Sequence, residues 1–407
     1  MKTTFISLFI VLLVFSTVYS AAGVGQQIPS QEGASDYPFL EEASFDRLIT
    51  VLLKIGHYPS MSACIIHDTT VLWSNGYGFS DLEAHIPATD QTIYVVASIT
   101  KTITSTALMQ LYEQGLFQLD GDVNMYLPFS LRNPTYPDDP ITIRMILSHS
   151  SSFTTDPETY HWFNYSNPPP IPGYPGDWLK QYLLPDGAYY TPEVWDNVHP
   201  PGSYMQYANI NFDIVAYLVE LLSGQPFHEY CTEHLFEPLG MTRTGFRLPD
   251  FPIQDVAFPY LYQNRMYQKL PHYQLFHYPI GGLMTTVDDL SCFLIAHMNN
   301  GIYNGTRILQ NDTIALMHTI QPPGNIYYNF HYGLGWMIVK APLRANAYIG
   351  HSGDIPGVHT RMFMDPSDDT GIICFFNSDR STFGEKLVSF LIQHLLFEKA
   401  KQLSYTR

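Results

Sequence analysis

The sequence predicts an α+β fold, an α/β sandwich in which one antiparallel sheet is built from both ends of the chain around an inserted, mainly helical lobe. Runs with strand-like alternation lie near both chain ends, whereas runs with helical periodicity dominate the middle. The 407 residues, 45% of them hydrophobic, suffice for one large domain. We expect this domain over 37–400, with a sheet lobe made of 37–97 and 331–400 and a helical lobe made of 98–330.

The N-terminal elements are predicted to be a helix and a strand pair. Apolar residues share helical spacing up to Gly56, where a helix would end: Phe45, Leu48, Val51, Leu52 and Ile55. Residues 60–67 are then predicted to form a strand, 68–70 a turn and 71–77 the hairpin partner of that strand.

The middle of the chain is predicted to be helical around a long irregular stretch. The expected helices cover 99–114, 211–224, 227–236 and 287–298. Residues 133–205 are rich in Pro, Gly, Tyr and Asn, so we expect long surface loops there and no regular structure.

The C-terminal part is predicted to return to strands. These are expected at 333–340, 345–351, 358–364 and 371–377, and a final helix is expected over 383–398. Because strands occur at both chain ends with helices between them, we expect the two groups to meet in one sheet.

The first twenty residues have the features of a secretory signal peptide. Lys2 precedes an apolar run that ends at Val18, and small residues follow from Ser20. We therefore expect residues 1–20 to be removed and residues 21–36 to form a flexible leader. An uncleaved signal anchor is the alternative, because the apolar run is near the lower length limit for spanning a bilayer. No later segment has the composition of a membrane span.

Sequons and cysteines agree with a protein in the secretory lumen or outside the cell. Three sites match the N-glycosylation pattern, at Asn164, Asn304 and Asn311. The four cysteines include no Cys-x-x-Cys pair, so neither a zinc site nor a disulfide scaffold is expected. Cys64 and Cys374 lie in apolar runs and are interpreted as buried thiols, with one disulfide left open.

The charge of the chain excludes one class of partner. Asp and Glu outnumber Lys and Arg by 37 to 20, giving a net charge of -17. Nucleic-acid phosphates would be repelled by this charge, so no nucleic acid is expected as a partner.

One Ser-x-x-Lys motif carries the strongest chemical signal. Ser98 and Lys101 are placed where a loop enters a predicted helix, and their spacing puts both on one helical face. A serine hydroxyl is a poor nucleophile until a nearby base takes its proton, and lysine can be that base when its surroundings lower its pKa. The helix N-terminus favours a developing oxyanion. Alone, the motif is more typical of a helix cap beside a solvated lysine, because Ser-x-x-Lys is expected about once by chance in a chain of this size.

Two further motifs accompany it in order along the chain. Tyr207-Ala208-Asn209 and His351-Ser352-Gly353 follow Ser98-Ile99-Thr100-Lys101, and with them the sequence resembles the serine beta-lactamase and penicillin-binding-protein superfamily, in its class C-like branch with esterase and D-aminopeptidase relatives. Flanking phrases agree with this resemblance over roughly residues 40 to 395: Leu147-Ser148-His149-Ser150-Ser151, Pro201-Gly202, Pro238-Leu239-Gly240-Met241, Gly281-Gly282-Leu283 and Tyr332-Gly333-Leu334-Gly335-Trp336.

The resemblance implies a beta-lactamase/transpeptidase-like fold and a serine hydrolase that works through an acyl-enzyme. Ser98 would be the nucleophile, and Lys101 and Tyr207 would share the proton transfers. Asn209 would hold an amide side chain of the substrate and keep Lys101 oriented, and His351, Ser352 and Gly353 would line the cleft edge. The backbone N–H groups of Ser98 and Asp354 would form the oxyanion hole. The expected partner is a small-molecule, peptide or ester substrate, and this chemistry requires no cofactor and no metal.

One position departs from the commoner pattern of the superfamily. Many members carry lysine at the start of the third motif, where it helps to hold the substrate carboxylate, and this chain has His351. Histidine is only partly charged near neutrality, so it is a weaker carboxylate anchor. We therefore expect poor or absent turnover of penicillins.

Simpler interpretations stand beside these. Tyr207 is one of 29 tyrosines and could be a packing residue, while Asn209 could cap the following helix. His149 is expected to order the adjacent serine-rich turn rather than to act in catalysis. The metal-ligand types at His228, Glu229, Glu233 and His234 lack His-Glu-x-x-His spacing, which favours a solvated helical face.

Two other classes of protein compete with the serine hydrolase. An α/β-hydrolase would need a Gly-x-Ser-x-Gly elbow, and the nearest string, Gly350 to Asp354, lacks the final glycine. A catalytically inactive extracellular binding protein on the same fold is the second alternative. The four residues Ser98, Lys101, Tyr207 and Asn209 are all present, which favours an enzyme.

Overall fold

A computed structural model describes residues 42–155, 175–340, 347–380 and 382–404. Its longer helices are α2 (Glu42–Ile55), α3 (Thr100–Glu113), α5 (Gly176–Leu183), α6 (Ile210–Ser223), α10 (Val287–Met298) and α12 (Phe383–Ser404). Shorter helices are α4 (Ile143–Leu147), α7 (Phe227–Cys231), α8 (Glu237–Leu239), α9 (Tyr278–Gly281) and α11 (Asn311–Met317), with the 3-10 turn η1 (Ala97–Ile99) before α3.

One eight-stranded antiparallel sheet forms the centre of the molecule, in the order β10-β11-β12-β13-β14-β1-β2-β3. The strands are β1 (Ser60–His67), β2 (Thr70–Asp81), β3 (Ile86–Pro87), β10 (Phe330–Tyr332), β11 (Met337–Lys340), β12 (Ala347–Ile355), β13 (Val358–Asp365) and β14 (Thr370–Phe376). β1 pairs with β14 so that Met61 lies opposite Phe376 and His67 opposite Thr370. The predicted sheet built from both chain ends is confirmed.

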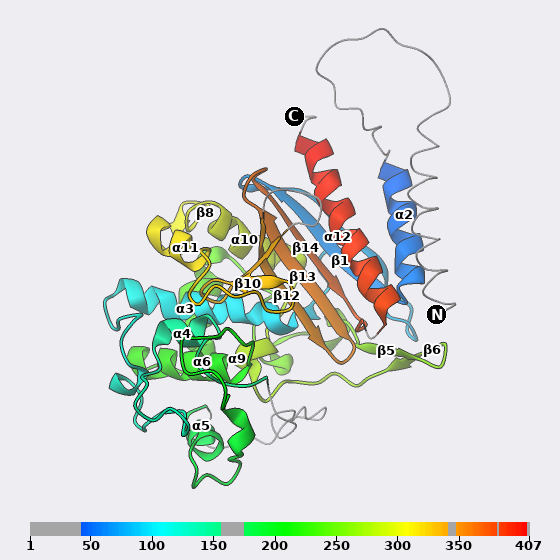
Figure 1. The fold of residues 1–407 in the computed structure, drawn as a ribbon. Coiled ribbons are helices and arrows are strands. Elements are labelled where there is room, and N and C mark those ends of the chain that lie inside the picture. Colours follow the sequence, from blue (N-terminus) through cyan, green and yellow to red (C-terminus); the bar gives the residue numbers. More distant parts are fainter. Residues whose placement is uncertain (1–41, 156–174, 341–346, 381, 405–407) are drawn as a thin grey trace.

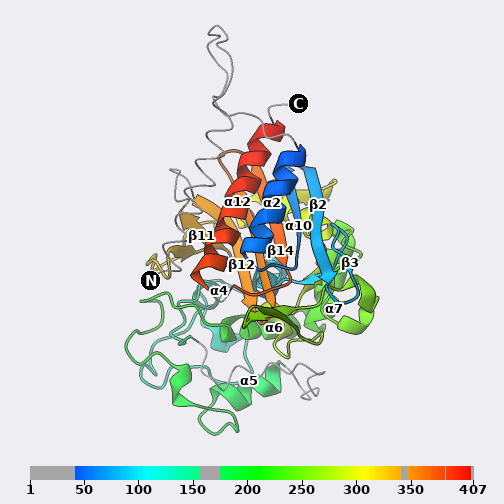
Figure 2. The ribbon, with the colours of Figure 1, turned by 90° about the vertical axis from the view of Figure 1, so that its right-hand side faces the viewer.

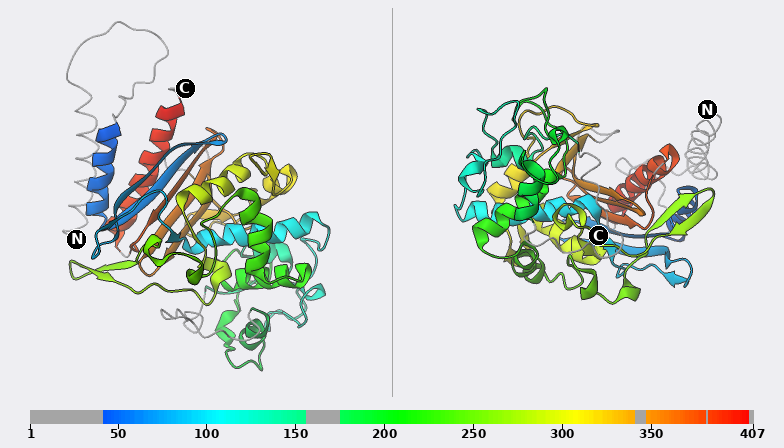
Figure 3. Two further views of the ribbon diagram at one scale, coloured as in Figure 1. Left: turned by 180° about the vertical axis from the view of Figure 1, so that it is seen from behind. Right: turned by 90° about the horizontal axis from the view of Figure 1, so that it is seen from below.

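Helices cover both faces of this sheet. α2 and α12 lie side by side on one face, and α10 with the other helices covers the opposite face (Figure 1, Figure 2). The same three layers appear from behind (Figure 3). β1 is buried on both sides because its residues alternate: Ala63 and Ile65 belong to the core under α2 and α12, whereas Cys64 and Ile66 belong to the core of the helical side.

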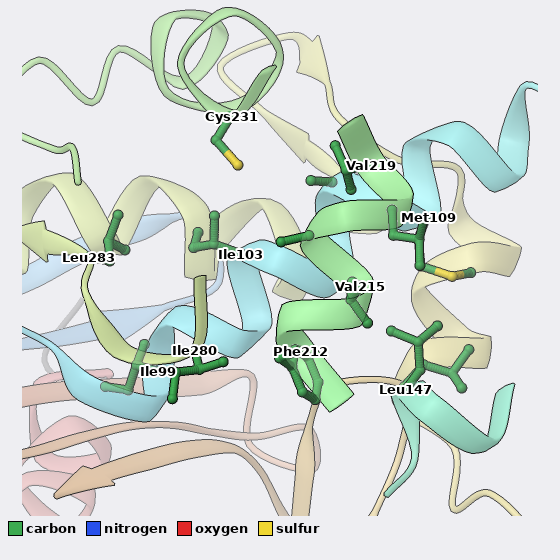
Figure 4. Close-up of a cluster of buried hydrophobic side chains, with 14 of the residues drawn as sticks. Ile99, Ile103, Met109, Leu147, Phe212, Val215, Val219, Cys231, Ile280 and Leu283 are labelled. Atoms are coloured by element: carbon green, nitrogen blue, oxygen red, sulfur yellow. The ribbon is translucent and has the colours of Figure 1, made fainter. Parts of the chain in front are cut away.

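The helical side is organised around α3 and α6. Ile103 and Met109 of α3 lie in one cluster with Phe212, Val215 and Val219 of α6 (Figure 4). α3 is buried along almost its whole length, including its serines and threonines, whose hydroxyls donate hydrogen bonds to backbone carbonyls. The helix that follows Ser98 is therefore held rigidly inside the molecule.

The structure corrects three details of the predicted elements. Residues 133–205 do not lack regular structure, because α4 and α5 lie within that range. The strand expected over 333–340 begins only at Met337, because 333–336 form a turn between β10 and β11 in which Gly335 has a φ of 83°. The helix expected over 227–236 continues through a π-helical turn at Thr232–Phe236 into α8.

Other predicted features are found in part. All four cysteines are free; Cys64, Cys231 and Cys374 are buried thiols, whereas Cys292 is partly buried. The sequon residues Asn304 and Asn311 are exposed, whereas Asn164 lies outside the described residues, as do the predicted signal peptide and leader. Across the described ranges, no helix is both long enough and apolar enough to cross a membrane. Two-stranded pairs that were not predicted, such as β4 (Tyr94–Val95) with β7 (Met284–Thr285), brace the helical side.

Candidate active site

Ser98 lies in η1, at the point where the chain enters α3. The residue before it, Ala97, has a φ of 48°, a left-handed conformation that costs energy for any residue with a Cβ. Ser98 is partly exposed, although Ala97 and Ile99 beside it are fully buried. The local turn thus presents one hydroxyl at the surface of a packed core.

Lys101 and Tyr207 converge on this hydroxyl from two elements. Lys101 Nζ lies 2.9 Å from Ser98 Oγ, and Tyr207 OH lies 3.0 Å from the same atom. Lys101 is one helical turn further along α3, whereas Tyr207 comes from the segment before α6. The structure brings together the three residues that the sequence proposed as nucleophile and proton-transfer groups.

The surroundings of Lys101 fix its amine. The side chain is fully buried, and Nζ also donates a hydrogen bond of 2.7 Å to the backbone carbonyl of Ile280 in α9. Nζ lies 5.3 Å from the centre of the Tyr207 ring and 5.9 Å from that of Phe212, distances at which the π-faces attract a cation. These contacts hold the amine beside Ser98 Oγ.

β12 passes directly against the segment that carries Ser98. A Cβ atom on Gly353 would lie 2.6 Å from the Val96 carbonyl oxygen and 2.7 Å from Ala97 Cβ. Thr360 of β13 donates a hydrogen bond of 2.8 Å to the same carbonyl. The close approach requires glycine at position 353, and it places the third motif beside Ser98.

His351 is buried within the third motif, with 1% of its surface exposed. Its Nδ1 lies 2.7 Å from the carbonyl oxygen of Ser352, which can only accept, so Nδ1 carries a proton. Its Nε2 lies 2.7 Å from Tyr332 OH and can then accept the phenolic proton. Burial, reinforced by the nearby Lys101 charge, lowers the pKa of His351 to about 3. His351 is therefore a neutral side chain near pH 7.

Asp354 and Ser352 direct their side chains to partners within the protein. The Asp354 carboxylate accepts two hydrogen bonds from Arg380, of 2.8 and 2.7 Å, and lies 2.8 Å from His359 Nδ1. Burial acts to raise the pKa of Asp354, but His359 and Arg380 hold it below its usual range. The Ser352 hydroxyl lies 4.0 Å from Met337 Sδ. The Asp354 carboxylate is therefore held by Arg380 and His359.

A comparison with known protein families identifies the family of this chain. Residues 45–396 match the model of the Beta-lactamase family. The chain belongs to the beta-lactamase family. Membership supports a hydrolase at the family level, and the resemblance inferred from the three motifs is thereby confirmed.

Several proteins of known sequence or structure are similar to this beta-lactamase family chain. Protein flp of Staphylococcus aureus (strain N315) is 23% identical, over 88% of this chain and 67% of its own. The octameric penicillin-binding protein homologue from Pyrococcus abyssi is 25% identical with a TM-score of 0.67, covering 87% of this chain and 78% of its own. The D-amino acid amidase from Ochrobactrum anthropi SV3, at 20% identity, TM-score 0.70 and coverage of 89% and 99%, shares the fold.

The sequence segments that flank the three motifs pack around the start of α3. The Val96 N–H donates to the Leu283 carbonyl at 2.8 Å, and the Leu283 N–H donates to Thr100 Oγ1 at 3.1 Å. A Cβ on Gly335 would lie 2.1 Å from Ser105 Oγ, and the Gly335 N–H donates to the Leu147 carbonyl at 3.0 Å. These segments therefore pack around the helix that begins just after Ser98.

Two groups at the site, the Tyr332 hydroxyl and the Ile280 carbonyl, were not predicted from the sequence. For Asn209 the sequence left two interpretations, a substrate contact and a helix cap. Tyr332 stood in a flanking segment without a role, although its hydroxyl lies 2.7 Å from His351 Nε2. The Ile280 carbonyl carries no sequence signal, because any residue supplies a backbone oxygen. Asn209 directly precedes α6 as its N-cap residue, and its side chain makes no capping hydrogen bond to the helix.

The residues considered as metal-ligand types lie apart from this site. Glu229 and Glu233 are exposed on α7 and the π-helical turn, whereas His228 and His234 are partly buried. Among the residues with assigned positions, no group of three or more His, Cys, Asp or Glu side chains is arranged to hold a metal ion. The solvated helical face remains the interpretation of this cluster.

Proposed function

We propose that this protein is a serine hydrolase that cleaves an ester or amide through an acyl-enzyme formed on Ser98. One observation carries the proposal: Ser98 Oγ is within hydrogen-bonding distance of both Lys101 Nζ and Tyr207 OH, at 2.9 and 3.0 Å. A serine between two groups able to move protons has what nucleophilic catalysis needs. The fold of the beta-lactamase family supports it.

The proposed reaction begins from a Tyr207 phenolate beside the Lys101 ammonium, and the phenolate takes the proton of Ser98. Ser98 Oγ then bonds to the substrate carbonyl carbon, and the carbonyl oxygen takes the negative charge beside the backbone N–H groups of Ser98 and Asp354. The bond from this carbon to the leaving oxygen or nitrogen breaks as Tyr207 returns the proton to it. Water then attacks the acyl-enzyme, which releases the acid and restores the Ser98 hydroxyl.

Because His351 is neutral, the third motif favours substrates that present no carboxylate to it. Both of its ring nitrogens are already engaged, by Tyr332 OH and by the Ser352 carbonyl. A neutral, buried imidazole gives a carboxylate no charge partner, and Arg380 is already bound to Asp354. We therefore place neutral esters and amides ahead of penicillins, whose carboxylate would lack such a partner. Asn209 is proposed to hold an amide of the substrate.

We further propose that the protein is exported and that its signal peptide is removed after Ser20. The apolar run up to Val18 and the exposed sequon residues Asn304 and Asn311 support this. The mature N-terminus, determined by mass spectrometry of protein recovered from the culture medium, should begin at residue 21. Residues 1–20 found on the secreted chain would contradict the cleavage.

The central experiment is hydrolysis of a short-chain nitrophenyl ester by the purified glycosylated protein beside its Ser98→Ala variant. Turnover should fall by more than about a thousandfold in the variant. A serine-directed phosphonate should add its mass to Ser98 in the wild type only. Equal turnover in both proteins, or labelling at another residue, would contradict the assignment.

Penicillin turnover provides the second arm of the same experiment. Nitrocefin and a penicillin should be hydrolysed much more slowly than the neutral ester, because the third motif lacks a cation. Fast nitrocefin hydrolysis that is lost in Ser98→Ala would preserve the serine hydrolase and overturn the substrate preference. A protein neither labelled nor active would instead be a binding protein on this fold.

A further inference from the structure

The loop after α4 contains a buried histidine that the proposed reaction does not use. His149 has 1% of its surface exposed and a φ of 56°. It follows α4 and precedes the serines of the turn, far in sequence from Tyr207. A buried imidazole with a left-handed backbone is an unusual feature beside a reactive site, so its contacts need a reason.

His149 contacts the chain on both sides of Tyr207. Its backbone carbonyl accepts the Gln206 N–H at 2.7 Å, and its Nδ1 accepts the Ala208 N–H at 3.2 Å. Its ring packs on the Tyr207 ring with centres 4.3 Å apart and planes tilted by 31°. His149 therefore holds the backbone on both sides of Tyr207 by hydrogen bonds and packs its own ring against the Tyr207 ring.

The hydrogen bonds determine where the proton of His149 lies. Asn211 accepts a hydrogen bond from Ser151 Oγ at its Oδ1, so its Nδ2 is the atom that faces His149 Nδ1, at 3.2 Å. Nδ1 thus receives two donors, Ala208 N–H and Asn211 Nδ2, and cannot carry a proton itself. The imidazole is neutral with its proton on Nε2, a buried atom without a hydrogen-bond partner in the part of the chain that the structure describes.

The charges around His149 act in the same direction. Burial, then the Lys101 charge and then His351 lower the pKa of His149 well below its usual range. The other rings against it are Tyr332, at 4.5 Å with nearly perpendicular planes, and Phe212, at 5.3 Å. No acidic group is among the influences on this histidine, and the opposite effect of the Ala208 backbone hydrogen bond is the smallest of them.

We propose that His149 is the positioning residue of Tyr207, which it holds at Ser98 Oγ through the Gln206 and Ala208 backbone and through ring contact. The inference rests on the proposed function, because it gives Tyr207 a part in proton transfer. A neutral imidazole adds no positive charge beside Lys101 and Tyr207, so it supports the tyrosine without competing for protons. His149 itself makes no contact with Ser98 in the described structure.

A double-mutant cycle with Tyr207 tests the proposal. His149→Ala should lower kcat for the neutral ester by at least about tenfold, with KM changed less than about threefold, since proton transfer contributes about 10²–10⁴ in rate. In a Tyr207→Phe background the same substitution should change kcat less than about threefold. A purely structural role would give the same loss in both backgrounds and would overturn the proposal.

Two variants separate positioning from folding. His149→Asn keeps an acceptor near Nδ1 and tolerates a φ of 56°, so it should recover a large part of the lost kcat. His297→Asn is the matched control: His297 is also buried and hydrogen-bonded, to Thr106 and His318, yet contacts none of the three reactive residues. When the concentration of active sites is determined by phosphonate labelling, His297→Asn should leave kcat unchanged in both the wild-type and the Tyr207→Phe backgrounds.

A measurement that does not need turnover distinguishes this inference from the proposed function. Histidine ¹⁵N NMR, with the His149 signal identified by its loss in His149→Asn, should show a neutral ring protonated on Nε2 from pH 8 to pH 5. A signal that titrates with the ordinary pKa near 6.5 overturns the inference even if the protein is inactive. Turnover independent of Ser98 would instead overturn the proposed function.

Discussion

At the scale of single residues, the position of Ser98 depends on how closely Gly353 approaches Ala97. Ala97 is held at a φ of 48°, and the missing side chain of Gly353 leaves room for its Cβ. The left-handed turn at Ala97 costs energy, so it persists only because β12 and β13 enclose it. The packing of neighbouring residues thereby helps to place the Ser98 hydroxyl.

Gly353→Ala tests this dependence. The added Cβ would meet the Val96 carbonyl at 2.6 Å and Ala97 Cβ at 2.7 Å, so the strand or the turn must move. We expect kcat/KM to fall by more than about tenfold and the free energy of unfolding to fall by about 1–3 kcal/mol. Gly245→Ala is the control, since its nearest atom is a side-chain carbon of Phe251 at 3.3 Å. Wild-type activity in Gly353→Ala would refute the tight approach.

The residues of the site were predictable to different degrees. Ser98, Lys101 and Tyr207 were identified because their side chains are specific to the chemistry and stand in ordered motifs. Tyr332 was not assigned, because its role arises only when β10 and β12 bring its hydroxyl to His351. Roles created by tertiary contact leave no mark in local sequence.

At the scale of elements, α3 is fastened to α9 by polar groups inside the core. Thr104 Oγ1 donates to the Pro279 carbonyl at 2.6 Å, next to the Ile280 carbonyl that receives Lys101 Nζ. A buried carbonyl that loses its donor costs about 1–3 kcal/mol. The contact between the two helices therefore bears on both stability and the position of the lysine.

Thr104→Val should lower the free energy of unfolding by about 1–3 kcal/mol and kcat by several-fold, because the valine keeps the volume but cannot donate. Chemical denaturation and ester turnover would measure both effects. Thr232→Val is the matched control, since the Thr232 hydroxyl donates to the His228 carbonyl on an exposed turn. Equal stability losses in the two variants would show that the hydrogen bond from Thr104 to α9 contributes no more to stability than a hydrogen bond on an exposed turn.

Elements with a clear period were predicted well. β1 and α10 have the bounds that their apolar patterns predicted, Ser60–His67 and Val287–Met298. α5 was missed because the composition of 133–205 dominated the prediction, although Trp178, Leu179, Tyr182 and Leu183 mark one buried face. The turn at 333–336 was missed because the apolar residues on both sides of Gly335 continue the strand-like pattern, whereas Gly335 adopts a φ of 83°.

At the scale of the whole molecule, buried neutral histidines make stability depend on pH. Burial lowers the pKa of His351 to about 3 and that of His359 to about 4, in the second case against the effect of Asp354. Their folded-state pKa values lie below the unfolded value near 6.5, so the unfolded chain binds more protons as the pH falls. The stability they provide is complete above pH 6.5 and is lost as the pH falls towards 3.

We therefore expect the free energy of unfolding to decrease by up to about 2 kcal/mol per histidine between pH 7.5 and pH 5. Asp379 opposes this decrease, because burial, followed by Glu385, raises its pKa to about 6 and its protonation favours the folded state. Urea denaturation at several pH values would measure the slope. Replacing the exposed His85 with glutamine should leave the slope unchanged. Constant stability over this range would contradict the buried neutral state.

The pairing of β1 with β14 has a consequence for the order in which the protein is made. Ser98 emerges early in synthesis, but the strand that supports its turn from the other side, β12, and the strand that completes the sheet beside β1, β14, are translated near the end. Contacts this far apart in sequence form slowly, and partly made chains expose apolar surface. The turn that carries Ser98 therefore gains its support from β12 only when most of the chain has been made, well after its partners Lys101 and Tyr207 have emerged.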